Sequence, residues 1–582
     1  MPAPRRGHPS TAIRPALVAL LVAGAAAAAA ASVAACAGES DATDRARTAP
    51  AGRLASAADL ESMLRYIERG WTTLRRTHAE LPAAAVDPKL PPRSSHPVYV
   101  PATEDLAVLR RRLTAEVGAA GMATIDLRVL PRAPGRISEH GLLYLPEPYV
   151  VPGGMFNEMY GWDSFFIVLG LLDDGEVDLA RSMVDNFVYQ VEHYGTILNA
   201  NRTYYLTRSQ PPFLTRMVLA VYRRTRDRAW LAGTLPAIEK YHAYWTREPH
   251  LVPATGLSRY HDLGSGPAPE VLASRWKKGT TYYDTVAAYY REHEVRDYDE
   301  RRFYDPDRGR LTDLFYAADR SMRESGFDPS RRFGVFNAAV LSVNPVCLNS
   351  LLYAMERDTA DILTELGRGD PAGWRRRAET RRRAIDRYLW DDERGLYLDY
   401  DFESGARRDY PYATMFFPLW AGIASEGQAA RVAANLRLLE APGGLSASAE
   451  ESGAQWDLPW GWAPLVWIAV QGLRHYGYGD DADRLSINFV SLVLKEYLER
   501  GAIFEKYDVA ARESAASGIK FGYRSNEVGF GWTNGVALEL LAGLPPARRA
   551  LCRRLDGVGV GAARAGGPAM TTAGKNTRRQ SQ

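Results

Sequence analysis

The spacing of apolar residues constrains this chain most, because they recur at helical intervals through several separate segments. Such spacing places apolar side chains on one face of a helix. The clearest examples are residues 176–193, 213–226, 371–389, 427–440 and 482–499. No strong β-hairpin pattern is visible, and only residues 396–400 are spaced as a short strand. The sequence therefore predicts an all-α assembly of helix pairs.

The connectors between these segments alternate between short ones and long ones rich in Gly, Pro and aromatic residues. We expect the long loops to gather at one end of the helix pairs and to carry the chemistry, because functional residues concentrate on loops held by a rigid scaffold. The apolar spacing does not by itself show how the helix pairs close on one another.

The N-terminal segment predicts export. Arginines precede an apolar, alanine-rich stretch from Ala16 to Ala35, which is typical of a secretory signal, with a retained membrane helix as the alternative. The triplet 33–35 before Cys36 resembles the lipobox of bacterial lipoproteins. This resemblance implies a signal peptide over 1–35, lipidation at Cys36 and a lipid-anchored protein in the periplasm or at the cell surface.

The flanks of the chain lack apolar periodicity. Residues 36–57 are rich in Ala, Ser, Thr, Asp and Gly, which predicts a flexible tether. Residues 546–582 are basic and similarly biased, which predicts a disordered tail. The remaining span, 58–545, is expected to form one catalytic domain.

Charge and cysteine content exclude several classes of function. A formal net charge of +3 over 582 residues leaves no basic stripe for nucleic acid. The arginine-rich run 375–383 has helical spacing and is expected to be a solvated face. Beyond Cys36 only Cys347 and Cys552 remain, so no disulfide framework is implied. No CxxC, HExxH or Cys/His cluster occurs, so neither a metal site nor a cofactor is predicted.

Acidic residues recur in loops that also hold aromatic rings and hydrogen-bond donors. These loops are 152–163, 199–213, 323–328, 455–464 and 504–508. Taken singly, each has a structural explanation as a turn, a helix cap or a surface ion pair. Together they place many Gly, Pro, Trp and acidic residues in loops at a cost in stability, which indicates a site. Hydrolysis of an acetal needs two such carboxylates, on opposite faces of the sugar.

Several of these segments resemble the trehalase family, glycoside hydrolase family 37. Residues 152–166 are similar to its first signature, PGGRFxExYxWDxY, and residues 455–464 match its second, QWDxPxGWxP. The family's sugar-binding loop, general-acid loop, general-base loop and C-terminal motif resemble 199–212, 324–328, 505–508 and 529–535. The order agrees from about residue 150 to 545, and the chain is identified as a member of the family, nearest to its neutral-trehalase-like branch.

This resemblance implies an (α/α)6 barrel, a helical toroid with long active-site loops. It also implies inverting hydrolysis of α,α-trehalose to two glucose molecules by an enzyme that we expect to be monomeric. Asp328 would be the general acid and Glu505 the general base that activates water. Trp456 and Trp460 would be walls of the pocket. The substrate-binding residues would be Phe156, Trp162, Asp163, Asn199, Arg208, Gln210, Glu270, Trp456, Trp460 and Glu527.

Departures from the family pattern leave the substrate open. Met155 replaces the arginine of the first signature and supplies neither donor nor charge. The loop 267–270 matches its counterpart only weakly, and residues 522–527 replace a glycine-rich stretch. Glu527 and Arg524 are the candidates to restore the lost polar contact. Alternatives are hydrolysis of another α-glucoside and a catalytically silent sugar-binding lipoprotein, which would have no need of two opposed carboxylates.

Overall fold

The computed structural model describes residues 53–133, 135, 137–273, 275 and 279–561. The predicted signal over 1–35, Cys36 and most of the predicted tether lie outside these residues. None of the described helices combines the length and the apolar character needed to cross a bilayer.

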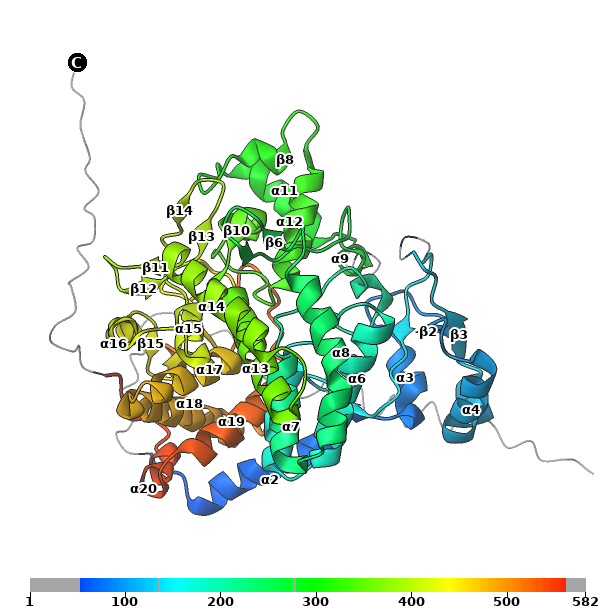
Figure 1. Ribbon diagram of the computed structural model, residues 1–582, viewed down its shortest axis with the longest axis horizontal. Helices are drawn as coiled ribbons and strands as arrows, with labels where there is room; N and C mark the ends of the chain where they lie inside the picture. The colour runs from blue at the N-terminus through cyan, green and yellow to red at the C-terminus, as the bar shows by residue number, and fades with distance from the viewer. Residues whose placement is uncertain (1–52, 134, 136, 274, 276–278, 562–582) are drawn as a thin grey trace, which may run out of the picture. The chain divides into compact units, whose positions relative to one another are not determined.

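Helices in the described part of the chain form an inner ring and an outer layer (Figure 1). The inner helices are α5 (Asp163–Asp173), α7 (Leu214–Thr225), α13 (Val346–Leu366), α15 (Phe417–Ala421), α17 (Ala463–His475) and α19 (Gly531–Gly543). Each inner helix contacts the next, and α19 returns to contact α5, so the ring closes. The outer helices alternate with them in sequence, the first of them preceding α5: α2 (Ala57–Leu74), α6 (Val177–His193), α8 (Arg228–Trp245), α14 (Pro371–Tyr388), α16 (Glu426–Ala434) and α18 (Gly479–Arg500). This alternation is the (α/α)6 barrel, which confirms the predicted fold class.

Burial explains which helices lie inside. Inner helix α5 is apolar around almost its whole circumference, whereas outer helix α14 buries one narrow face. Glycines let α5 and α19 approach closely, because a Cβ on Gly535 would lie 2.1 Å from the Phe166 carbonyl oxygen. The segments recognised from their spacing correspond to α6, α7, α14, α16 and α18, since helices with one apolar face give the clearest signal.

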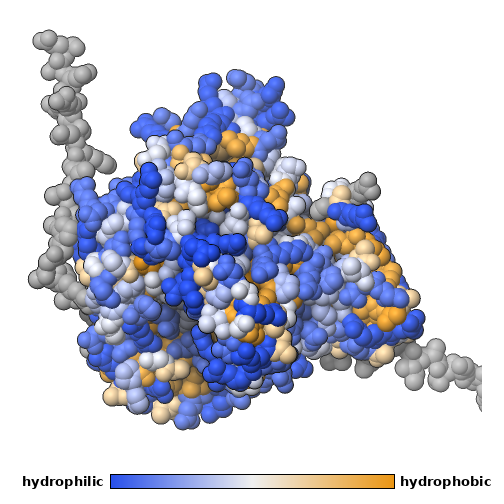
Figure 2. All heavy atoms as spheres, viewed as in Figure 1, coloured by the Kyte–Doolittle hydropathy of each residue, from blue (hydrophilic) through white to orange (hydrophobic). Residues whose placement is uncertain are grey.

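Between α2 and α5 the chain forms a small sheet-and-helix unit with its own apolar core, which was not predicted from the sequence. It is called the N-terminal unit below. Strands β2 (His96–Val100), β3 (Ile125–Val129) and β4 (Leu142–Leu143) make a parallel sheet in the order β3-β2-β4. Helices α3 (Leu81–Ala85) and α4 (Leu106–Met122) share its apolar core. Figure 2 shows apolar residues gathered over this unit at the right of the view. Strand β3 alternates apolar and polar residues, but β2 is buried over four consecutive positions and β4 has only two residues, so the three segments gave no common strand pattern.

A long connection between α8 and α13 carries part of the site. It contains α9 (Pro269–Ala273), α11 (Tyr282–Glu292) and α12 (Asp313–Glu324). Elsewhere β17 (Trp460–Trp462) pairs antiparallel with β18 (Lys506–Asp508). The remaining elements are β1 (Arg75–Arg76), β5 (Tyr149–Val150), β6 (Leu251–Val252), β7 (Leu257–Ser258), β8 (Tyr304–Asp305), β9 (Arg310–Leu311), β10 (Val343–Asn344), β11 (Trp390–Asp391), β12 (Leu396–Tyr397), β13 (Tyr400–Asp401), β14 (Ala406–Arg407), β15 (Glu440–Ala441), β16 (Gly444–Leu445) and α20 (Pro546–Arg549).

The folded part extends beyond the predicted boundary at 545. After α20 the chain remains packed on the barrel, with Cys552 buried. The Asn488 amide donates to the Gly559 carbonyl at 2.7 Å, and the Arg512 guanidinium donates to the Leu555 carbonyl at 3.0 Å. The prediction of disorder over 546–582 is therefore wrong for 546–561, because bonds to backbone carbonyls leave no mark on composition. Cys347 and Cys552 are both buried and free.

Candidate active site

Loops that lead into the inner helices surround a cavity of about 490 Å³. Its lining comes from both family-like signatures, the long connection after α8 and the segments around β18. The lining residues are Lys89, Pro152, Met155, Phe156, Tyr160, Trp162, Asp163, Asn199, Tyr205, Arg208, Gln210, Glu270, Val271, Arg323, Gly326, Asp328, Trp456, Glu505, Tyr523, Ser525, Glu527, Phe530 and Trp532. The cavity thus brings together every residue predicted for catalysis or substrate binding except Trp460.

Trp460 does not form a wall of this cavity. It lies in β17, where it pairs with Asp508 of β18 and is almost fully buried. Trp456 does line the cavity, and its ring stacks on Trp462 with centroids 3.8 Å apart. The sequence alone does not tell these tryptophans apart, because their orientation depends on the strand pairing.

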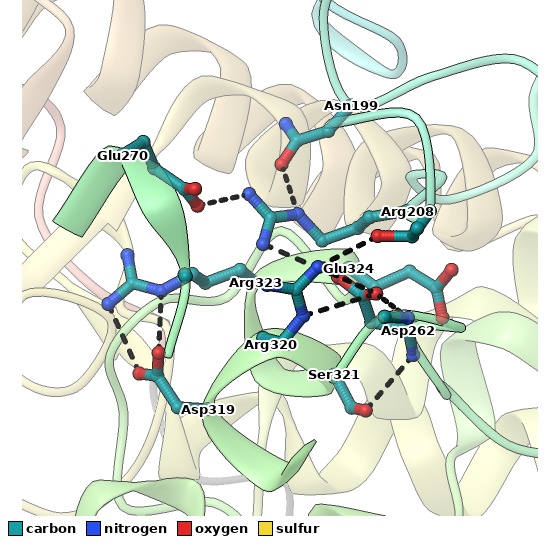
Figure 3. Close-up of polar contacts among 12 residues, drawn as sticks. Asn199, Arg208, Asp262, Glu270, Asp319, Arg320, Ser321, Arg323 and Glu324 are labelled. Atoms are coloured by element: carbon teal, nitrogen blue, oxygen red, sulfur yellow. Dashed lines mark hydrogen bonds and ion pairs between the residues drawn. The ribbon is translucent and has the colours of Figure 1, made fainter. Parts of the chain in front are cut away.

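Arg208 forms a buried polar network at the cavity wall (Figure 3). Its Nε donates to Asn199 Oδ1 at 2.9 Å, and its Nη2 donates to Glu270 Oε1 at 2.5 Å. Arg208 Nη1 and Glu270 Oε2 are buried without a hydrogen-bond partner in the described part of the chain. Arg208 Nη1 lies 3.6 Å from Asp262 Oδ2, which is an ion pair but too long for a hydrogen bond. Because buried polar atoms are normally hydrogen-bonded, this donor and the Glu270 acceptor can still bond a ligand hydroxyl.

Arg323, which the sequence analysis did not assign a role, lines the same cavity. Both guanidinium contacts to Asp319 measure 3.1 Å, and Nη1 lies 3.8 Å from Asp328 Oδ2 (Figure 3 shows the Asp319 pair). It stands in the last turn of α12, directly before the acid loop 324–328. The charged residues of segment 323–328 were the sequence signal from which a role for Arg323 could have been predicted.

The loop that bears Asp328 is anchored by Glu324, which is fully buried. Glu324 accepts hydrogen bonds from the Ser209 amide at 3.1 Å, the Tyr244 hydroxyl at 2.8 Å and the His261 amide at 2.6 Å. Burial in the cavity raises the pKa of Asp328 to about 6, against the opposing charges of Arg323 and Arg208. A carboxyl with such a pKa can hold a proton near neutral pH and release it during a reaction.

Glu505 lies in the segment immediately before β18, and its side chain is 3% exposed. Its Oε2 accepts from Lys506 Nζ at 2.9 Å and its Oε1 accepts from the Tyr523 hydroxyl at 2.5 Å. Burial lowers the pKa of Lys506, and the charge of Glu505 opposes this effect. Glu505 is therefore held in place through both oxygens by neighbouring donors.

Asp163 is the first residue of α5 and is buried in the cavity that Asp328 and Glu505 also line. Burial raises its pKa to about 8, and the negative charges of Glu505 and Asp328 act in the same direction. At neutral pH the Asp163 carboxyl therefore carries a proton and can donate a hydrogen bond to a ligand oxygen.

Gln455 of the second signature joins the acid and base systems. Its Nε2 donates to the Asp328 carbonyl oxygen, and its Oε1 accepts from the Tyr523 amide at 3.2 Å. The adjacent Trp456 amide donates to the Pro329 carbonyl at 3.2 Å. This signature thus fixes the loop of Asp328 relative to the segment that touches Glu505.

Arg524 and Glu527, the candidates to replace the arginine that is missing at Met155, occupy different positions. Met155 lines the cavity with an exposed side chain. Arg524 donates to the Ile519 carbonyl at 3.0 Å and is not part of the lining, so it does not restore the contact. Glu527 does line the cavity, and burial together with the charge of Glu505 raises its pKa.

Other residues line the cavity that were not predicted from the sequence, namely Lys89, Tyr160, Tyr205, Tyr523, Ser525, Phe530 and Trp532. Most stand in or beside recognised motifs, so their sequence position was a usable signal. Lys89 lies far from every motif and gave none. Within the described residues no group of three His, Cys, Asp or Glu side chains is arranged to hold a metal ion.

Comparisons with known proteins agree on one family. A sequence model of the trehalase family matches residues 112–545. The cytosolic neutral trehalase of Neurospora crassa is 36% identical over 488 residues, which cover 74% of this chain and 63% of that protein. The cytosolic neutral trehalase of Saccharomyces cerevisiae is 39% identical over 429 residues, which cover 66% and 55%. The chain thus spans about three fifths of the length of these curated relatives.

A solved structure shares the fold. Neutral trehalase Nth1 from Saccharomyces cerevisiae superposes with a TM-score of 0.71 at 33% sequence identity. The match covers 85% of this chain and 96% of that chain.

The predicted location at the periplasm or cell surface is contradicted by these relatives, which are named as cytosolic. They are also fungal proteins, so they lend no support to a bacterial lipoprotein signal. The apolar character of an alanine-rich stretch does not by itself decide whether a chain is exported. Cys36 lies outside the described residues.

Proposed function

The chain belongs to the trehalase family, and from this premise we propose that it hydrolyses α,α-trehalose to two glucose molecules with inversion. The observation that carries the proposal is the convergence of Asp328, Glu505 and Asp163 in one cavity. Its volume of about 490 Å³ lies within the range of small-molecule sites, roughly 300–1,000 Å³. The cytosolic relatives support a cytoplasmic location for this chain.

In the proposed reaction, protonated Asp328 gives its proton to the glycosidic oxygen as the bond from that oxygen to the anomeric carbon breaks. Glu505 takes a proton from a water molecule, whose oxygen forms the new bond to the anomeric carbon from the opposite face. The two proton transfers balance, and exchange with solvent restores both carboxyl groups. Side chains carry every step, so we propose that no cofactor takes part.

The surrounding residues support a sugar in this position. Arg208 Nη1 and Glu270 Oε2 offer a buried donor and acceptor to hydroxyl groups. Protonated Asp163 offers a further donor between the two catalytic carboxyls. Trp162 and Trp456 supply aromatic faces with centroids 5.8 Å apart.

The test is glucose release from a panel of α-linked diglucosides, followed by NMR at early times. Inverting hydrolysis of trehalose should yield one α-glucose and one β-glucose, because only the attacked carbon changes configuration. Two α-glucoses would contradict inversion. Faster cleavage of another diglucoside would favour the alternative substrate that the Met155 substitution suggests, and binding without cleavage would favour a silent binder.

A further inference from the structure

Tyr523 extends its side chain from the segment 522–527 to a proposed catalytic carboxyl. This segment stands where the family has a glycine-rich stretch. The Tyr523 hydroxyl donates to Glu505 Oε1 at 2.5 Å, and the residue lines the cavity. Burial of the hydroxyl raises the pKa of Tyr523 well above its ordinary value, and the charge of Glu505 acts in the same direction. The hydroxyl therefore keeps its proton and remains a donor at neutral pH.

The two oxygens of Glu505 face different surroundings. Oε2 accepts from Lys506 Nζ at 2.9 Å, and Lys506 is fully buried and is not among the residues that line the cavity. Lys506 Nζ also donates to the Ser525 carbonyl at 3.0 Å and lies 5.3 Å from the Trp462 ring centroid. Oε1 instead meets Tyr523, which does line the cavity. Oε1 is therefore the oxygen on the side from which a water molecule can approach.

Backbone and ring contacts of neighbouring residues fix the position of Tyr523. Its amide donates to Gln455 Oε1 at 3.2 Å. Gly522 has φ +125°, and a Cβ there would lie 2.8 Å from the Gln455 side chain, so this close approach requires glycine. The ring of Phe521 packs on that of Phe336 with centroids 5.7 Å apart. The hydroxyl is thus a donor in a fixed place, against which the carboxylate of the base aligns.

The ring and the hydroxyl of Tyr523 make separate contacts. The ring centroid lies 4.0 Å from Lys506 Nζ, a contact that a phenylalanine in this position would keep. The residue is 42% exposed, so much of its surface faces solvent. What the hydroxyl adds is the bond to Glu505.

We propose that Tyr523 is a positioning residue that aims Oε1 of Glu505 at the attacking water. The inference rests on the proposed hydrolysis of trehalose and deepens it. A carboxylate oxygen has two lone pairs, so Oε1 can accept from Tyr523 on one and from the water on the other. As the water oxygen bonds to the anomeric carbon, its proton passes to Oε1, and Asp328 protonates the leaving oxygen. Tyr523 keeps its own proton throughout and acts through Glu505.

The experiment compares wild type, Tyr523→Phe and Tyr523→Leu in steady-state hydrolysis of trehalose. Tyr523→Phe removes only the hydroxyl, so kcat should fall about tenfold while KM changes less than about twofold. Tyr523→Leu should lose at least as much kcat. The matched control is Tyr222→Phe, because the Tyr222 hydroxyl also donates to a carboxylate, Glu365 Oε1 at 2.7 Å, but lies in the last turn of α7 outside the cavity lining. Its kcat should stay within about twofold of wild type.

A second comparison uses azide, a nucleophile that needs no general base, to rescue Glu505→Ala. Azide takes the place of water at the anomeric carbon, and glucosyl azide forms as Asp328 protonates the leaving oxygen. Combined with Glu505→Ala, Tyr523→Phe should no longer cause its tenfold loss, because the carboxylate through which the hydroxyl acts is absent. An equal loss in both backgrounds would assign Tyr523 to the sugar or to the fold, and would overturn the inference.

The kcat comparison decides the matter even without azide rescue. A Tyr523→Phe enzyme with kcat within twofold of wild type would overturn the inference, as would a loss that appears only in Tyr523→Leu or only in KM. In these cases the proposed function stands, because wild type still hydrolyses trehalose. A wild type that releases no glucose from trehalose would refute the proposed function, and the inference with it.

Discussion

The acid loop and the base segment hold the same kind of group in different surroundings. Asp328 lies in the loop after α12, keeps 36% of its side chain exposed, and has the Arg323 guanidinium 3.8 Å away. Glu505 precedes β18, is 3% exposed, and accepts close hydrogen bonds from Lys506 and Tyr523. The carboxyl of Asp328 is left able to exchange a proton, and the carboxyl of Glu505 is oriented through both oxygens by neighbouring donors.

The proposed roles of general acid and general base therefore follow from the neighbours of each carboxyl. A general acid needs a raised pKa, and a base needs its charge kept and its oxygens oriented.

The largest effect should come from removing either carboxylate. Asp328→Asn and Glu505→Gln keep side-chain shape but abolish proton transfer, so each should lower kcat about 10³-fold or more. Exposed carboxylates provide matched controls in Asp392→Asn and Glu294→Gln, which should stay near wild type. Initial rates of glucose release on trehalose measure this, and activity within tenfold of wild type in either variant would end its assignment.

The next effect concerns stability on the base side. Lys506→Met leaves Glu505 buried without its cation, which should lower the free energy of unfolding by about 3 kcal/mol or more. The exposed Lys240→Met should change it by less than about 0.5 kcal/mol. Urea unfolding at neutral pH gives both values. A Lys506→Met protein as stable as wild type would show that the ion pair does not hold this segment.

An effect that is smaller within any one pH unit concerns Asp163, whose pKa responds to both Glu505 and Asp328. Its pKa is raised from 3.8 to about 8 in the folded protein, so the folded state binds this proton more tightly than the unfolded chain. That contribution is complete below about pH 4 and is lost as pH rises through about 8, by at most about 1.4 kcal/mol per pH unit. Asp163→Asn removes this loss, so it should gain stability relative to wild type from pH 5 to pH 8. Urea unfolding at four pH values tests this, and parallel curves would contradict it.

The smallest effect sharpens the acid side. Activity should fall as pH rises through about 6, because the acid Asp328 must be protonated. Arg323 lowers the pKa of Asp328, so Arg323→Met should move the alkaline limb of kcat/KM about one pH unit higher. The exposed Arg296→Met is the control. An unmoved limb in Arg323→Met would mean that another group sets it.

Helical spacing predicted helix pairs, and it marked the outer helices α6, α14, α16 and α18 together with the inner helix α7. The barrel class and most of the cavity came from the resemblance to a known family, whose short motifs marked the loops of Asp328, Glu505 and Arg208. The same motifs did not separate Trp456, which lines the cavity, from Trp460, which is buried in β17. The parallel sheet of the N-terminal unit was also missed, because β2 lacks alternating burial, β4 has only two residues, and strand pairing joins segments far apart in the chain.

By itself the sequence determined that helix pairs carry acid-bearing loops, since residue type and spacing are local properties. Only the tertiary structure decided that α19 closes the ring on α5, that Tyr523 reaches Glu505, and that Lys89 enters the cavity. These contacts join residues far apart in the chain, and such contacts depend on how helices and sheets pack in three dimensions. No pattern of neighbouring residues encodes that packing in a form that can be read directly.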